Sequence, residues 1–162
     1  GGYGLMRFSI FLPLFFMFIA MTGIILTAAL CMRQTDLKAL IAMSSVSHMN
    51  LVIVATLIQS QWSFTGAMAM MIAHGLVSSA LFCLANTAYE RTNSRTMVLL
   101  RGAMLIFPLA GAWWLTILLS NMALPPLINF SAELLIMASL FDWSTMAFLI
   151  VALNLIFTTA YT

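Results

Sequence analysis

Three titratable side chains stand inside long apolar stretches of this sequence: His48, His74 and Glu133. No Asp, Glu, Lys or Arg lies within four positions of any of them. In a bilayer an ionised side chain costs about 2.5 kcal/mol or more unless it is paired or hydrated, and ionisable groups in such positions mark proton and ion pathways. We therefore expect these three side chains to form a proton relay.

Polar side chains accompany all three titratable groups at helical spacing. Residues three or four positions apart share one face of a helix, so a hydroxyl or amide at that spacing can pass or orient a proton. The residues expected to support the relay are Ser44 and Ser45 before His48, Ser78 after His74, and Asn129 before Glu133.

Structural roles remain open for these groups. Each histidine could equally serve helix packing alone, with its hydrogen bonds satisfied. Glu133 points more strongly to function, because desolvation disfavours the ionised carboxylate while a neighbouring cation favours it, which suits a group that exchanges protons. Two histidines and a carboxylate could also bind a metal. That alternative is disfavoured, because no helix offers ligands at His-x-x-x-His spacing and no loop is rich in ligands.

The composition predicts the environment of these side chains. The chain of 162 residues is 64% hydrophobic and 6% charged, whereas about a quarter of the residues of a soluble domain are charged. Such long apolar runs belong in a lipid bilayer, where helices satisfy their own backbone hydrogen bonds. We predict an all-α, polytopic transmembrane bundle. The net charge of +2, without a basic stretch, argues against nucleic acid as a partner.

About five spans are expected, in one fragment of a transmembrane domain covering residues 1–162. About twenty apolar residues suffice for a helix to cross the hydrocarbon. The predicted spans are residues 9–32, 37–58, 64–88, 102–141 and 144–162, the last running to the end of the sequence. The sequence starts at Gly1 without an initiator methionine and stops inside an apolar run, so we expect it to be an internal piece of a longer chain.

Pro125 and Pro126 interrupt the fourth apolar stretch. Two prolines remove two N–H donors and free carbonyls in the preceding turn. Residues 102–141 could form a hairpin of two short helices or one crossing made of two half-helices, and we favour the broken crossing. Asn121 and Asn129 flank the break and can bond the freed backbone groups, as in broken helices that line a cavity within a membrane protein.

Basic residues predict the orientation. Two connecting segments, residues 33–38 and 90–101, hold five of the six Lys and Arg residues, and Arg7 is the sixth. The positive-inside rule places these segments on the inner side of the membrane. Fourteen methionines and a single lysine hint at mitochondrial coding, so the inner side would be the matrix. Trp62 and Trp143 would then lie at the opposite interface.

Several segments resemble a known family. They are QTDLKALIA at 34–42, SSVSHM at 44–49, MIAHGLVSS at 71–79, NTAYERTNSRT at 86–96, and NMALPP at 121–126 followed by Glu133. Together they are similar to the chain 4 family of mitochondrial NADH–ubiquinone oxidoreductase (complex I), one of its antiporter-like membrane-arm subunit families. The similarity extends over essentially the whole sequence and is specific.

The resemblance implies more than the spacing alone. Family members have fourteen transmembrane helices with two inverted five-helix repeats, and this sequence would supply helices nine to thirteen. The broken twelfth helix would fall at Pro125 and Pro126. By motif match, His48 and His74 correspond to central histidines of the family's proton path, and Glu133 to the carboxylate of its twelfth helix. The glutamate–lysine pair of the first repeat would lie outside this sequence.

The function implied is proton translocation in the inner mitochondrial membrane, coupled to electron transfer from NADH to ubiquinone. The expected partners are the other membrane-arm subunits of complex I and the lipid bilayer. NADH, FMN, iron–sulfur clusters and ubiquinone would bind elsewhere in the complex, and this chain is expected to hold no redox cofactor and no metal. Two alternatives remain open: a structural membrane-arm subunit without its own proton path, and a free-standing cation/proton antiporter.

Overall fold

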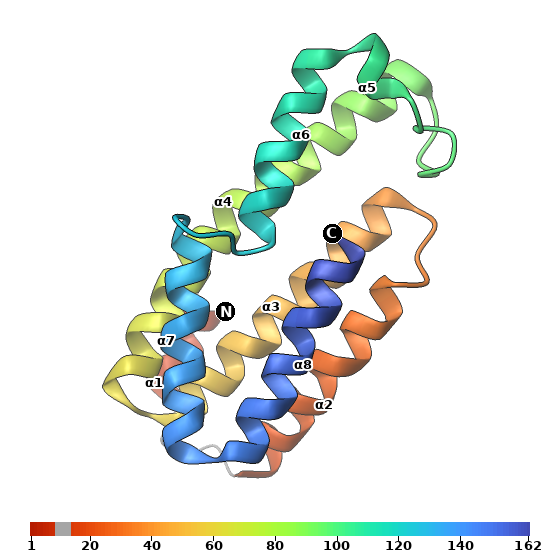
Figure 1. Cartoon of the computed structure of the whole chain (residues 1–162). Helices are drawn as coiled ribbons and strands as arrows, with labels where there is room; N and C mark the ends of the chain where they lie inside the picture. Colours follow the sequence, from red (N-terminus) through yellow and green to blue (C-terminus); the bar gives the residue numbers. More distant parts are fainter. Residues whose placement is uncertain (9–13) are drawn as a thin grey trace.

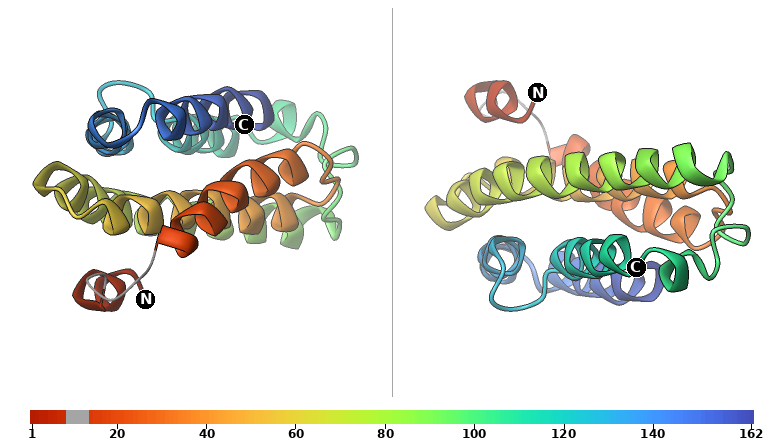
Figure 2. Two further views of the ribbon diagram at one scale, coloured as in Figure 1. Left: turned by 90° about the horizontal axis from the view of Figure 1, so that it is seen from below. Right: turned by 90° about the horizontal axis from the view of Figure 1, so that it is seen from above.

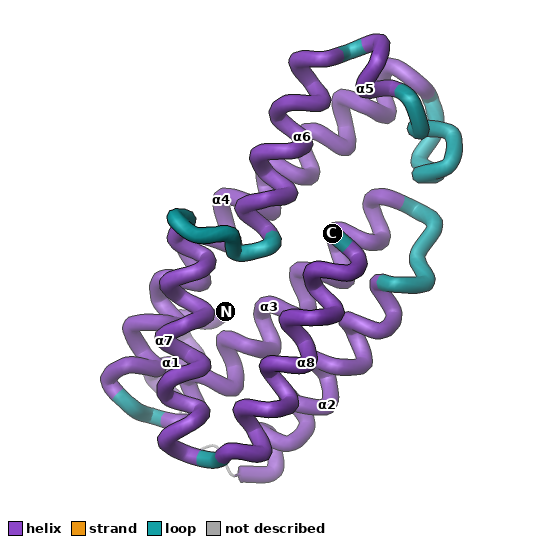
Figure 3. Tube along the Cα trace, viewed as in Figure 1, coloured by secondary structure: helices purple, strands orange, loops and turns teal. Residues whose placement is uncertain are grey.

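The computed structural model describes residues 1–8 and 14–162, so the beginning of the predicted span 9–32 lies outside the described residues. Every regular element in those two ranges is a helix, and the only β-type pairing there is an isolated bridge (Figure 3). The all-α prediction is confirmed. The helices are α1 (Gly2–Phe8), α2 (Leu14–Cys31), α3 (Leu37–Ile58), α4 (Gln61–Thr92), α5 (Ala103–Ile106), α6 (Pro108–Asn121), α7 (Ile128–Trp143) and α8 (Thr145–Tyr161).

Helices α2, α3 and α4 are long and apolar enough to cross a membrane, and α8 is a shorter apolar helix of 17 residues. Helix α3 occupies the residues of the predicted span 37–58. Helix α4 extends beyond the predicted 64–88 at both ends and has 32 residues. At 1.5 Å per residue it is about 48 Å long, whereas the hydrocarbon core of a bilayer is about 30 Å thick. An α4 that crosses a bilayer must therefore tilt or project from it.

Local signals separate α3 from α4. Gln59 ends α3 in the left-handed conformation, with φ of 59°. Ser60 and Ser63 then form a capping box: the Ser60 hydroxyl accepts a hydrogen bond from the Ser63 N–H, and the Ser63 hydroxyl accepts one from the Ser60 N–H, both at 3.0 Å. These bonds satisfy N–H groups that the first turn of a helix leaves free. Asn93, also left-handed, ends α4.

The predicted interruption at Pro125 and Pro126 is confirmed. Helix α6 ends at Asn121 and α7 begins at Ile128, so residues 122–127, which we call the break, separate them. Both helices pack on α4. In Figure 1, α6 runs along the C-terminal half of α4, and α7 continues along its N-terminal half. This arrangement is the one expected of a crossing made of two half-helices.

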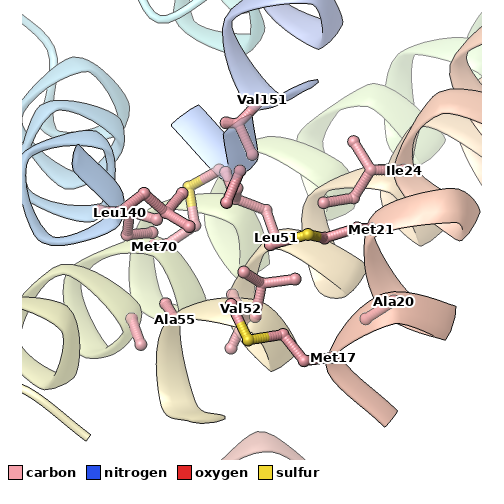
Figure 4. Close-up of a cluster of buried hydrophobic side chains, with 14 of the residues drawn as sticks. Met17, Ala20, Met21, Ile24, Leu51, Val52, Ala55, Met70, Leu140 and Val151 are labelled. Atoms are coloured by element: carbon pink, nitrogen blue, oxygen red, sulfur yellow. The ribbon is translucent and has the colours of Figure 1, made fainter. Parts of the chain in front are cut away.

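The helices form two layers, seen edge-on in Figure 2: α6, α7 and α8 lie on one side, and α3 and α4 on the other. Helix α2 packs against both α3 and α8. The apolar core between the layers comes from α2, α3, α4, α7 and α8 (Figure 4). Its fully buried side chains include Ile24, Val52, Met70, Ile136 and Val151.

The two basic segments predicted to lie on one side of the membrane are bonded to each other. Asp36 and Thr96 form an isolated antiparallel bridge. The Leu37 N–H donates to the Arg95 carbonyl and the Met97 N–H donates to the Thr35 carbonyl, both at 3.1 Å. The start of α3 and the segment after α4 are thereby joined directly.

Candidate functional site

His48, His74 and Glu133 come from three different helices and meet inside the bundle. The Nδ1 atom of His48 on α3 lies 3.9 Å from Oε1 of Glu133 on α7. The rings of His48 and His74, the latter on α4, have centroids 5.1 Å apart and planes inclined by 39°. All three side chains are buried. The structure thus brings together the three titratable groups that the sequence spreads over 86 positions.

The spacing within this cluster is close enough for proton exchange through a small movement or a water molecule. A direct hydrogen bond between nitrogen and oxygen is about 2.7–3.2 Å long, so the 3.9 Å between His48 and Glu133 is an ion-pair distance. A bridging water is nearly as favourable as a direct bond and fits contacts longer than about 3.5 Å. The Nε2 atom of His48 is buried and has no hydrogen-bond partner among the described residues.

Close packing of α7 on α4 sets the position of Glu133. Gly66 of α4 faces α7 at Ala132, the residue before Glu133: a Cβ atom built on Gly66 would lie 3.2 Å from the Ala132 carbonyl oxygen. Ala132 itself is fully buried. Small residues at a helix contact let two backbones approach closely, as in membrane proteins generally. Helix α4 also packs on α3, which places His74 of α4 beside His48 of α3.

The serines predicted to support the relay differ in placement. Ser44 is buried and donates to the Ile41 carbonyl at 2.8 Å. Ser45 is only half-buried, and its hydroxyl donates to the Ala42 carbonyl. Ser78 is likewise half-buried, and its hydroxyl lies 3.4 Å from the Gly75 carbonyl. Each hydroxyl oxygen keeps lone pairs with which it can accept a hydrogen bond from a further donor.

Ser47, which the spacing argument did not select, is fully buried on α3 beside His48. Its hydroxyl donates to the Ser44 carbonyl at 2.8 Å. The buried positions of α3 around the site follow the pattern 44, 47, 48 and 51. The serines that lie beside His48 on the buried face of α3 are therefore Ser44 and Ser47.

Asn129 ties the break to the site. Its amide Nδ2 donates to the Ser120 carbonyl at 2.7 Å, across the break from α7 to the end of α6. This bond to a backbone carbonyl near the prolines is the role expected of Asn129. It also fixes the start of α7, one turn before Glu133. The Oδ1 atom of Asn129 is buried without a partner among the described residues. Pro125 and Pro126 themselves are exposed.

The chemistry available to this cluster is that of acids and bases. Within residues 1–8 and 14–162 no group of three or more His, Cys, Asp or Glu side chains is arranged to hold a metal ion. Two imidazoles and a carboxyl group in contact can pass protons among themselves, and the charge of each affects the proton affinity of its neighbours.

Fold and site together define a polytopic helical membrane protein with a buried acid–base cluster at the contact of three helices. The family model described as NADH:quinone oxidoreductase/Mrp antiporter, transmembrane, matches residues 1–159. The chain belongs to this family.

Curated relatives point to the same family. NADH-ubiquinone oxidoreductase chain 4 of Carassius auratus is 56% identical over 168 residues, which cover 99% of this chain and 36% of the relative. The proteins of the same name from Squalus acanthias and Struthio camelus are 54% and 53% identical, with 99% and 100% of this chain covered and 36% and 37% of the relative. The chain thus spans little more than a third of the length of these relatives.

Proposed function

We propose that this chain is part of a proton-translocating subunit in the membrane arm of complex I. In this proposal, residues 1–162 form one fragment of the proton-translocating transmembrane domain, with His48, His74 and Glu133 as its relay. The observation that carries the proposal is the meeting of these three groups, at 3.9 Å and 5.1 Å, within a bundle of membrane-length helices. The names of the curated relatives support the assignment to complex I.

The relay acts through charge. Two unit charges 3.9 Å apart, the distance between His48 Nδ1 and Glu133 Oε1, interact by about 4 kcal/mol at an effective dielectric constant of about 20 and about 1 kcal/mol in water. Removing or adding a proton on Glu133 therefore alters how strongly His48 holds its own. A charge that arrives on one side of the cluster drives proton release on the other.

The proposal also covers location and partners. The chain lies in the inner mitochondrial membrane, with the segments 33–38 and 90–101 facing the matrix, because five of its six Lys and Arg residues stand there. Its partners are lipids and the other membrane-arm subunits. NADH, FMN, the iron–sulfur clusters and ubiquinone bind to other parts of the complex, and this subunit contributes proton movement without electron transfer.

Replacing Glu133 with glutamine tests the proposal in the full-length subunit within the assembled complex. Glutamine keeps the size of the side chain and one acceptor oxygen, replaces the other oxygen with an NH2 donor, and removes the exchangeable acid. We expect NADH-driven proton uptake into sealed vesicles to fall relative to the rate of NADH oxidation. Glu90→Gln is the matched control, because Glu90 is an exposed carboxylate that accepts a hydrogen bond from Asn86 at 2.8 Å. Unchanged protons per NADH in Glu133→Gln would favour a structural subunit.

A free-standing cation/proton antiporter is the second candidate, because the family description joins Mrp antiporters with NADH:quinone oxidoreductases. The same buried acid–base cluster could serve either protein. Purification from native membranes separates the two: a chain that migrates with NADH–ubiquinone oxidoreductase activity belongs to the complex, and one that migrates apart from it is an antiporter.

A further inference from the structure

Helices α4 and α6 enclose an apolar groove that the relay does not use. The groove has a volume of about 690 Å³ and lies between the C-terminal half of α4 and most of α6. Leu84 and Ala88 line it from α4, and Phe107, Trp114 and Leu118 line it from the other side. In the described chain α6 packs against α4 and α5 (Figure 1), so the groove is separate from the core that carries the relay.

Arg91 is the only charged side chain among the described residues that line this groove. It stands at one end, in the last turn of α4, where its guanidinium carbon lies 4.3 Å from the centre of the Phe107 ring. This cation–π contact holds the charge at the groove. Thr87 and Thr92 also line the groove, but both donate their hydroxyl protons to carbonyls of α4 itself. A ligand of the groove therefore meets one positive charge at one end and mostly apolar surface along the rest.

No carboxylate of the described chain neutralises Arg91. The one ion pair in that part of the chain joins His48 and Glu133. Glu90 precedes Arg91 in the sequence but is exposed and accepts a hydrogen bond from Asn86 at 2.8 Å. Arg91 thus offers its charge and its N–H donors to a ligand. Phosphate and carboxylate are the anions that the planar fork of a guanidinium fits best.

The dimensions of the groove fit one acyl chain. Its lining extends from Phe107 to Leu118, a rise of eleven residues, or about 16 Å at 1.5 Å per residue. One leaflet contributes half of the hydrocarbon core of a bilayer, about 15 Å. A helix of that length and about 10 Å in diameter would occupy about 1,250 Å³, nearly twice the volume of the groove. The groove therefore suits a chain thinner than a helix, with its negative end at Arg91.

We propose that the α4–α6 groove binds an anionic phospholipid, with one acyl chain between the two helices and the phosphate at Arg91. The segments 33–38 and 90–101 hold five of the six Lys and Arg residues, and the backbone bonds between these segments keep them together. Basic residues at a membrane surface attract anionic lipids, and basic pockets between membrane helices bind their head groups. This inference goes beyond the proposed function, because it requires a bilayer around the chain and no proton relay.

The test uses the assembled complex in phosphatidylcholine nanodiscs that contain a small share of a photoreactive lipid. That lipid is either phosphatidylglycerol or phosphatidylcholine, each with a diazirine in one acyl chain, and the labelled peptides are identified by mass spectrometry. We expect the peptide with Trp113 and Trp114 to be labelled about fivefold more by phosphatidylglycerol, the factor that corresponds to about 1 kcal/mol for one basic residue. Labelling of α2, whose exposed apolar side chains report lipid in general, normalises each value.

Variants of the full-length subunit separate the charge of the groove from its shape. Arg91→Gln should lower labelling by phosphatidylglycerol to the level of phosphatidylcholine. Arg33→Gln is the matched control, because Arg33 is exposed, lies in the segment bonded to 90–101 and does not line the groove; it should keep the preference. Ala88→Phe fills the groove beside Arg91 and should lower labelling of the α6 peptide by both lipids.

The outcomes decide between a lipid site and other occupants. Equal labelling of the α6 peptide by both lipids in the unaltered complex would overturn the proposal, and so would a preference that survives Arg91→Gln. Cross-links from the groove to another segment of the subunit or to another subunit, without lipid label, would also overturn it. None of these results depends on proton uptake, so the proposed relay is judged separately by Glu133→Gln.

Discussion

Gly66 stands where α4 and α7 approach each other closely, and replacing it tests whether this contact positions Glu133. A Cβ atom at Gly66 would lie 2.9 Å from Ile136 Cγ1, 3.1 Å from Leu135 Cβ and 3.2 Å from the Ala132 carbonyl oxygen. Favourable contacts between carbon atoms lie at about 3.5–4.0 Å. Alanine therefore pushes α7 away by roughly half an ångström, and leucine by more, because its side chain extends beyond the Cβ atom.

Two opposing effects set the size of the change. Replacing a helical glycine with alanine stabilises a helix by about 0.5–1 kcal/mol, whereas overpacking a tight contact costs about 1–3 kcal/mol. We expect Gly66→Ala to destabilise the α4–α7 contact by about 1 kcal/mol net and Gly66→Leu by about 3 kcal/mol. Because Glu133 follows Ala132 directly, the same movement draws its carboxyl group away from His48.

The assay is hydrogen exchange of the α7 backbone amides in the intact complex, together with protons taken up per NADH. Gly66→Leu should speed the exchange of α7 amides and lower protons per NADH. Gly75→Ala is the control on the same helix, because a Cβ atom at Gly75 meets no atom of the described chain within 4 Å. That variant should slow hydrogen exchange of the α4 amides and leave the number of protons taken up per NADH unchanged. If both Gly66 variants showed slower hydrogen exchange of the α7 amides and an unchanged number of protons per NADH, the α4–α7 contact would not position Glu133.

Two further predictions concern the ends of helices. Asn129→Leu removes the 2.7 Å bond to the Ser120 carbonyl and should destabilise the break by about 0.5–1.5 kcal/mol, because one hydrogen bond is lost while the carbonyl keeps its bond from the Ala123 N–H at 3.3 Å. Amide exchange in the break would then rise, and an unchanged rate would contradict the role given to Asn129. Ser60→Ala removes the hydroxyl that accepts from the Ser63 N–H at 3.0 Å and should destabilise the first turn of α4 by about 1 kcal/mol. Faster exchange confined to that turn is the expected result, and none would mean that the capping box adds little.

The sequence predicts the helical class and the interruption of the fourth apolar stretch well, because both depend on local properties. Apolar runs of about twenty residues specify helices in lipid, and Pro125 and Pro126 cannot continue one. The three titratable residues of the site could also be selected, since charge-bearing groups are rare in this chain. Their mutual distances could not be predicted. His48 and Glu133 are 85 positions apart, and the packing of α3 and α7 against α4 and against each other determines that they meet.

Helix rotation explains the residues that the sequence reading missed. Ser45 and Ser47 both stand close to His48 in sequence, and a turn of 100° per residue places them on opposite sides of it. Helix α3 happens to present the side with Ser47 to its neighbours.

The bridge between Asp36 and Thr96 has a consequence for how α3 and α4 can move. It fastens the start of one helix to the chain just beyond the end of the other, so neither can slide along its axis without breaking two backbone bonds. Sliding by a single helical turn, about 5.4 Å, would be a displacement as large as the present 5.1 Å between the ring centroids of His48 and His74. The bridge therefore opposes sliding of the two helices that carry the imidazoles, and it leaves helix rotation and side-chain movement unopposed.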